Sequence, residues 1–132
     1  MSDTDYLALG RQFLGALGAE DWAAIRALVT ADVTWSFPGD ARISGIAEGV
    51  DAVVAKGTAI TSSGVRIELL NVLAGMDGAA VSLHNTATAE DGRSLDQYLV
   101  TVLTVRDGKI NKIDSFLSDP PKIAAYFGPS TT

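Results

Sequence analysis

The chain has 132 residues, no cysteine, 47% hydrophobic and 20% charged residues, and a formal net charge of −6 at pH 7. This length predicts a single domain over residues 1–132 that buries a core without disulfides, and the lack of cysteine excludes zinc-thiolate sites and thiol nucleophiles. The acidic balance, with scattered Lys and Arg, argues against nucleic-acid binding, which needs a basic stripe. The chain has no basic signal segment and no apolar run of ~18 residues, so we expect a cytoplasmic protein without membrane contact.

The first half of the chain has the periodicity of helices. Ser2 and Asp5 have the spacing of a capping box, and apolar residues follow at helical spacing up to Leu17. The elements predicted after this helix are a short helix over 22–29, a strand over 33–37 that Pro38 ends, a glycine-rich loop over 39–49 and a third helix over 50–60.

The second half contains three Asp-Gly pairs, each between β-branched, alternating runs. Asp-Gly between such runs is typical of tight hairpins, because the turn needs φ > 0, which glycine adopts at no cost. The sequence therefore predicts an antiparallel meander of four strands over 65–74, 79–89, 94–106 and 109–117, followed by a short closing helix that contains Tyr126 and Phe127.

Several local motifs resemble those of the nuclear-transport-factor-2-like superfamily, and of its SnoaL-like group in particular. The segments that carry the resemblance are Glu20-Asp21-Trp22, Ala31 to Trp35 with Pro38-Gly39, Ile43-Ser44-Gly45 with Gly49, Ala52 and Val53, and Arg106 to Ile110. The resemblance spans about Tyr6 to Phe127. It implies an α+β fold in which a cone-shaped, curved antiparallel sheet is covered on its concave face by three helices.

Period-2 alternation sorts the residues of each strand into two faces, and the resemblance indicates which face lines the cavity. On this basis we expect the concave side to carry the following pocket residues: His84, Gln97, Leu99, Thr101, Asp114 and Phe116 from the meander, with Trp35 and Phe37 from the first strand and Phe13 from the first helix.

Asp114 and His84 are the predicted catalytic residues, and whether they pair directly stays open. A carboxylate in a buried strand must be paired, hydrogen-bonded or shifted in pKa, and His84 is the only histidine, the side chain that exchanges protons near neutral pH. The resemblance adds that similar positions carry an acid–base carboxylate in SnoaL-like polyketide cyclases. The structural alternatives remain open: Asp114 as a strand-end hydrogen-bonding residue, and His84 on a polar strand face.

Other members of the superfamily use residues that this chain lacks. Matching to ketosteroid-isomerase-like enzymes puts Phe13 at the oxyanion tyrosine, Phe37 at the general base and Thr101 at the second oxyanion acid. In the match to epoxide hydrolases of this fold, Asp114 corresponds to one of their aspartates. The positions of their other water-holding residues carry different side chains in this chain. Neither mechanism is therefore expected in its usual form.

The sequence thus favours an enzyme that performs cofactor-free acid–base chemistry, such as isomerisation, cyclisation, dehydration or hydrolysis, on a small hydrophobic or polyketide-like molecule. The alternatives are a binding module without chemistry and an interaction protein. We expect no cofactor and no metal. The apolar residues Tyr98, Val100 and Val102 on the outer face of the meander predict a homodimer through the convex side of the sheet.

Overall fold

The computed structural model describes residues 1–130, and Thr131 and Thr132 lie outside the described part of the chain. The elements in chain order are α1 (Asp3–Gly18), α2 (Trp22–Leu28), β1 (Val29–Phe37), β2 (Gly45–Glu48), α3 (Val50–Thr61), β3 (Arg66–Ala74), β4 (Gly78–Thr88), β5 (Ser94–Arg106), β6 (Lys109–Leu117) and α4 (Pro120–Phe127). All predicted helices are present. The first strand begins earlier than predicted, at Val29, and β2 lies in the segment expected to be a loop.

The strands form one curved sheet in the order β2-β1-β6-β5-β4-β3. The predicted meander is confirmed, since β3 to β6 are sequential antiparallel neighbours. β1 joins its far side by pairing in parallel with β6, and β2 pairs antiparallel with β1. This arrangement is the α+β cone that the sequence predicted.

Two glycines of the Asp-Gly pairs have different roles in the meander. In the β5–β6 turn, Asp107 and Gly108 have φ angles of 52° and 81°, the left-handed pair that a two-residue hairpin requires. Gly78 serves a different purpose, because a Cβ built there would lie 1.9 Å from the carbonyl oxygen of Leu103. The backbone of β4 therefore approaches that of β5 more closely than a side chain allows.

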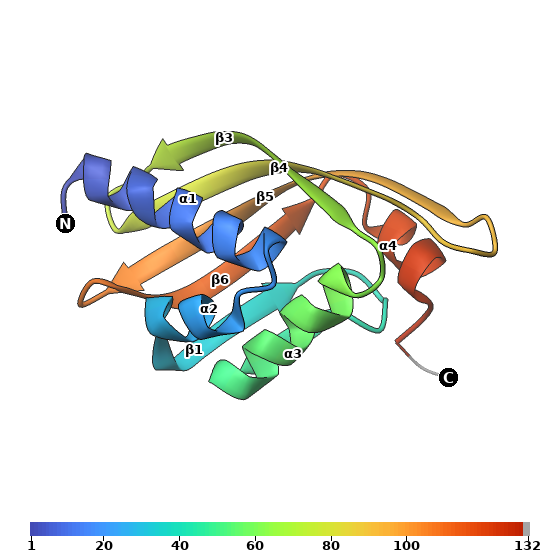
Figure 1. Ribbon diagram of the computed structural model, residues 1–132, viewed down its shortest axis with the longest axis horizontal. Helices are drawn as coiled ribbons and strands as arrows, with labels where there is room; N and C mark the ends of the chain where they lie inside the picture. Colours follow the sequence, from blue (N-terminus) through green and yellow to red (C-terminus); the bar gives the residue numbers. More distant parts are fainter. Residues whose placement is uncertain (131–132) are drawn as a thin grey trace.

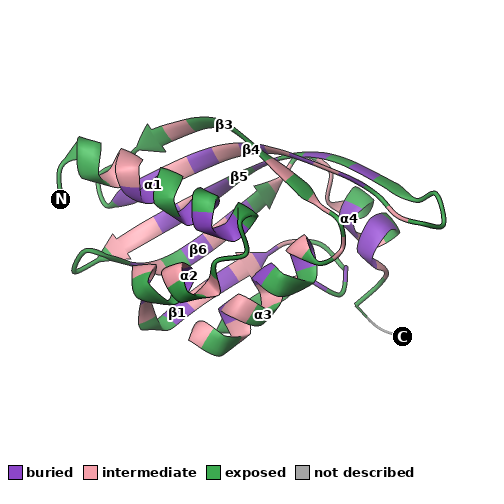
Figure 2. Ribbon diagram, viewed as in Figure 1, coloured by how far each residue is buried: buried purple, intermediate pink, exposed green. Residues whose placement is uncertain are grey.

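The helices α1, α2 and α3 cover one face of the sheet, and α4 closes one end (Figure 1). Their capping follows the sequence: Ser2 and Asp5 form the predicted capping box, and Asp21 accepts a hydrogen bond from the amide of Ala24. Burial alternates along β4 and β5 (Figure 2). The buried apolar residues of these strands belong to the same core cluster as those of α1. We call the helix-covered side the concave face and the other side the convex face.

One extra residue in β6 changes which side chains reach the concave face. Thr104 pairs with Lys112 and Val105 with Ile110, so Asn111 has no partner in β5 and forms a bulge. Ile110 and Ile113, three residues apart, are therefore both fully buried. Beyond the bulge, Ile113, Ser115 and Leu117 share the concave face.

Candidate functional site

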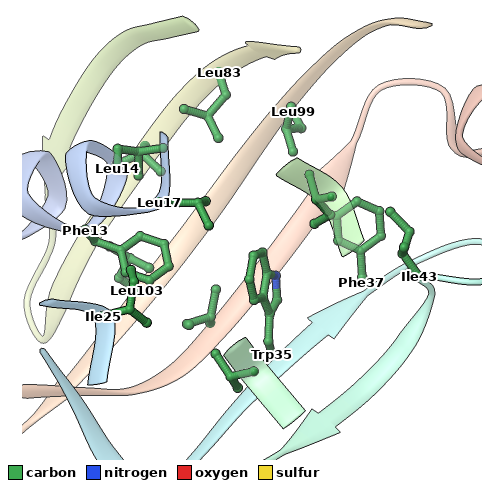
Figure 3. Close-up of a cluster of buried hydrophobic side chains, with 14 of the residues drawn as sticks. Phe13, Leu14, Leu17, Ile25, Trp35, Phe37, Ile43, Leu83, Leu99 and Leu103 are labelled. Carbon is green, nitrogen blue, oxygen red and sulfur yellow. The ribbon is translucent and has the colours of Figure 1, made fainter. Parts of the chain in front are cut away.

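The concave face and the helices enclose a narrow pocket. Apolar side chains form most of its wall: Phe13, Leu14, Leu17, Trp35, Phe37, Ile60, Ile67, Leu83 and Leu99. Figure 3 shows how the rings of Phe13, Trp35 and Phe37 lie beside the leucines of α1 and the meander. The remaining lining residues are Asn85, Thr101 and Ser115, which are polar but uncharged. The pocket therefore contains hydrogen-bonding groups but no ionisable side chain.

Two of these polar groups, Thr101 and Ser115, bond to each other, and Ser115 also bonds to the indole of Trp35. The indole Nε1–H of Trp35 donates to Ser115 Oγ over 3.0 Å, and the hydroxyls of Ser115 and Thr101 are also 3.0 Å apart. The ring of Phe13 meets that of Trp35 edge-on, with 6.3 Å between the ring centroids. These contacts fix the orientation of the indole in the pocket wall.

The free space inside this pocket is small. Its volume is about 20 Å³, which is room for about one water molecule. A ligand with a ring can enter only if the side chains on the facing helices move apart.

His84 does not lie in the pocket, and the predicted placement is wrong. It is on the convex face, where Nε2 is 2.6 Å from Asp96 Oδ1 and Nδ1 is 3.7 Å from Glu68 Oε1. Its ring stacks on Tyr98 at 4.3 Å and 5°. The concave face of β4 is occupied instead by the alternate set Val81, Leu83, Asn85 and Ala87, because the more apolar set of a strand packs against the core.

The predicted placements of Asp114 and Phe116 are also wrong. The bulge at Asn111 places both on the convex face, and Phe116 is 60% exposed. Asp114 Oδ1 accepts a 2.5 Å hydrogen bond from the hydroxyl of Ser36, and its other oxygen is 3.7 Å from Lys112 Nζ.

His84 and Asp114, whose direct pairing the sequence left open, are too far apart to contact each other. His84 is opposite Tyr98 in β5 and Asp114 is opposite Val102, four residues or about 13 Å further along that strand. The carboxylates that His84 contacts are Asp96 and Glu68 instead.

The other predicted pocket residues are on the concave face. Phe13, Trp35, Phe37, Leu99 and Thr101 line the pocket. Gln97 is 1% exposed on the same face, but it bonds the Tyr98 carbonyl and Ser118 Oγ and does not line the pocket. Asn85 and Ser115 were not among the predicted pocket residues. Both share their strand faces with apolar residues, which is the signal that would have identified them.

The convex face has an apolar centre and its own depression. Ser82, Val100 and Phe116 are direct neighbours across three strands. A groove of about 590 Å³ lies beside them, and its lining includes Ile46, Phe116, Asp114 and Lys112. The exposed aromatic rings and the ionisable groups proposed for catalysis thus lie together on this face.

Lys56 is a half-buried cation near the pocket, but its ammonium is already engaged. It donates to the carbonyls of Ile43 and Gly45 and lies 5.7 Å from the centre of the Phe37 ring. Burial lowers the pKa of this lysine. The contacts hold the loop before β2 against α3.

No helix within residues 1–130 is both long and apolar enough to cross a bilayer.

Known proteins are similar to this chain in sequence or share the fold described above. An uncharacterized protein of Mycobacterium tuberculosis is 29% identical over 130 residues, which cover 96% of this chain and 99% of that protein. The structure of Bal32a, from a soil-derived mobile gene cassette, has a TM-score of 0.89 at 22% identity and covers 95% of this chain and 98% of Bal32a. An NTF2-like protein from Burkholderia xenovorans has a TM-score of 0.83 at 23% identity and covers 96% and 98% of the two chains. The family model of the SnoaL-like domain matches residues 10–113, so the chain belongs to the SnoaL-like domain family.

Proposed function

We propose that this protein binds a small, uncharged and mainly apolar molecule in the concave pocket, by packing and hydrogen bonding. The observation that carries the proposal is the composition of the pocket wall, which has nine apolar residues and three neutral polar ones. This is the usual make-up of small-molecule sites, in which a few polar groups orient a ligand held by apolar contacts. Membership of the SnoaL-like family supports a site at this position of the fold.

The same composition favours binding over acid–base catalysis. A general acid or base must come within about 2.6–3.2 Å of the proton that it transfers, directly or through one water. The candidate groups, His84 and Asp114, are on the convex face and bond to Asp96 and Ser36. No ionisable side chain lines the pocket, so a bound molecule there would meet only neutral groups.

The experiment is a thermal-shift and calorimetric screen with uncharged aromatic and alicyclic probes, using toluene as the reference compound. Leu83→Phe fills the pocket from the centre of the concave face, and we expect it to abolish binding. Thr86→Phe adds the same ring three residues away on the convex face and should leave the affinity unchanged. If neither toluene nor any other uncharged probe binds the wild-type protein, the proposal is wrong.

A second candidate function, self-association, is favoured by the convex face. Tyr98 is 53% and Phe116 60% exposed there, and Val100 lies between them. The convex face consists of five long strands, which lie about 4.8 Å apart and are roughly 30 Å long, so its area is about 700 Å². Each partner in a stable interface contributes a similar area, ~800 Å². We propose that two copies pair through this face, which is independent of the ligand pocket.

A further inference from the structure

The side chain of Asn85 is the unexplained polar group of the concave pocket. It is 8% exposed and lines the pocket, and its Oδ1 is buried with no hydrogen-bond partner in the described structure. Burying an amide oxygen without a partner costs free energy, so such atoms are rare in folded proteins. A water molecule or a ligand is therefore needed to complete the hydrogen bonding of this amide, and the pocket has room for about one water molecule.

The neighbours of Asn85 do not supply the hydrogen bond that its Oδ1 lacks. Its cross-strand neighbours on the concave face are Ile67 and Gln97. The Nε2 of Gln97 already donates to the Tyr98 carbonyl and to Ser118, and its own Oε1 is also without a partner. Asn85 thus lies between an apolar side chain and an amide whose donors are used.

The polar groups at the other end of the pocket are engaged with one another. Thr101 lies opposite Val81 in β4, four residues or about 13 Å from Asn85 along that strand. Thr101, Ser115 and Trp35 form the hydrogen-bonded chain described above. Leu83 and Leu99 are paired across the strands between the two polar ends. The pocket is therefore apolar in the middle and has its unused hydrogen-bonding capacity at Asn85.

We infer that the ligand of the concave pocket is an uncharged molecule with a hydroxyl group on an apolar body, and that this hydroxyl bonds the Asn85 amide. The inference rests on the proposed function and names the ligand class for the same pocket. A hydroxyl both donates and accepts, so it satisfies the amide in either orientation of the side chain. A carboxylate or ammonium ligand is disfavoured, because the pocket wall offers no opposite charge to offset its desolvation.

The size of the pocket limits the body of this ligand. A cavity of roughly 150 Å³ is known to take a single benzene ring, whereas the free space here is about 20 Å³. A one-ring alcohol or phenol is the smallest ring-containing ligand of this class, and it enters only if side chains of the wall, such as Ile60 on α3 and Leu17 on α1, move apart. We therefore use p-cresol as the probe, with toluene as its partner without the hydroxyl.

The test measures the affinities of p-cresol and toluene by calorimetry or by titration of NMR shifts. We expect the wild-type protein to bind p-cresol about fivefold to tenfold more tightly than toluene, the range expected for one net hydrogen bond. Asn85→Leu should reduce this ratio to about one while toluene still binds. Ile60→Val, which adds room without touching a polar group, should raise both affinities and preserve the ratio.

The outcomes separate this inference from the proposed function. If both probes bind equally, or if the ratio persists in Asn85→Leu, the pocket binds apolar molecules but the hydroxyl inference is wrong. If neither probe binds, both proposals fail. Tighter binding of 4-methylbenzoate than of p-cresol would also overturn the inference, since it would show a preference for charge.

The melting temperature gives a second readout. It distinguishes an Asn85 that stabilises the fold from an Asn85 that serves only to bind a ligand. Replacing an unpartnered buried amide by leucine should leave the melting temperature unchanged or raise it. Thr101→Val is the control, because it breaks a formed hydrogen bond and should lower the melting temperature. If Asn85→Leu lowers it as much as Thr101→Val, or fails to fold, the amide supports the fold and the inference is overturned.

Discussion

The two faces of the sheet differ in the kind of polar group that they carry. The concave face has neutral groups, Asn85, Thr101 and Ser115, set among buried apolar side chains. The convex face has the ionisable groups His84 and Asp114, both next to exposed aromatic rings. Alternation along each strand keeps the two sets apart, although they come from the same strands.

This difference shows that residue type alone does not locate a site. Histidine and aspartate are the usual proton-transfer groups, yet here they contact other surface side chains on the face away from the pocket. The polar groups that line the concave pocket are an amide and two hydroxyls, all uncharged. The contrast therefore argues for recognition by shape and hydrogen bonding, and the experiments below test it from the largest expected effect to the smallest.

The largest difference should come from removing one phenylalanine on each face. Phe13 is 1% exposed beneath the helices, and Phe13→Ala should lower the free energy of unfolding by about 3–5 kcal/mol. Phe116 is 60% exposed, and Phe116→Ala should cost less than about 1 kcal/mol. Urea denaturation at low protein concentration, where self-association does not contribute, measures both. Equal costs would mean that the convex face is as well packed as the concave one.

The convex face should also determine whether the protein is a monomer or a dimer in solution. Light scattering at micromolar concentration is expected to give about twice the 13.7 kDa chain mass. Val100→Arg places a charge at the centre of this face and should give the monomer mass, whereas Ser94→Arg at its end should not. A wild-type monomer at these concentrations would remove the proposed dimer.

Two serines offer a comparison of hydrogen bonds on the two faces. Ser115→Ala leaves the buried Nε1–H of Trp35 without its partner, and we expect a loss of about 1–3 kcal/mol. Ser36→Ala removes a hydroxyl from Asp114, which is partly open to water, so its cost should be smaller, below about 1.5 kcal/mol. Thermal unfolding of the two variants tests the order, and a reversed order would contradict the description of the two environments.

A surface ion pair should give a smaller, pH-dependent effect. Hydrogen bonding to Arg106 is the main cause that lowers the pKa of Asp32 from 3.8 to about 2. Because the folded pKa is below the unfolded one, the stabilisation is complete above pH 3.8 and is lost as the pH falls through about 2. Asp32→Asn should remove this part of the acid-induced decrease in melting temperature. Added salt should weaken the effect because both side chains are exposed.

The smallest effect is expected on ligand binding when the convex ionisable groups are changed. His84→Gln and Asp114→Asn should each leave the affinity for p-cresol within about twofold of wild type, because neither residue lines the pocket. A tenfold change in either variant would contradict the separation of the two faces and would restore the catalytic hypothesis.

The hairpins and helices were predictable because their signals are local. Asp107-Gly108 supplies both positive φ angles of its turn, and Ser2 with Asp5 supplies both bonds of the capping box. The strand β2 was not predicted, since it has only four residues in a glycine-rich segment and is held by pairing with β1. Tertiary pairing of this kind leaves little trace in a short sequence window.

The face of each strand was harder to predict than the strand itself. For His84, the apolar alternate set with Leu83 indicates which face is buried, whereas the resemblance points to the opposite face. For Asp114, simple alternation from Ile110 gives the wrong face, because the bulge at Asn111 shifts the phase. The buried pair Ile110 and Ile113 was the available sign of that shift.

The bulge at Asn111 also determines what the loss of one residue would do to this strand. Deleting Asn111 would make Ile110 and Lys112 consecutive and would remove the bulge. Asp114 would stay on the convex face and Ser115 on the concave face, because both alternate regularly from Ile110 once the extra residue is gone. In a strand without a bulge, the same deletion would reverse the face of every residue beyond it. The bulge therefore lets this strand lose one residue while the pocket wall stays neutral.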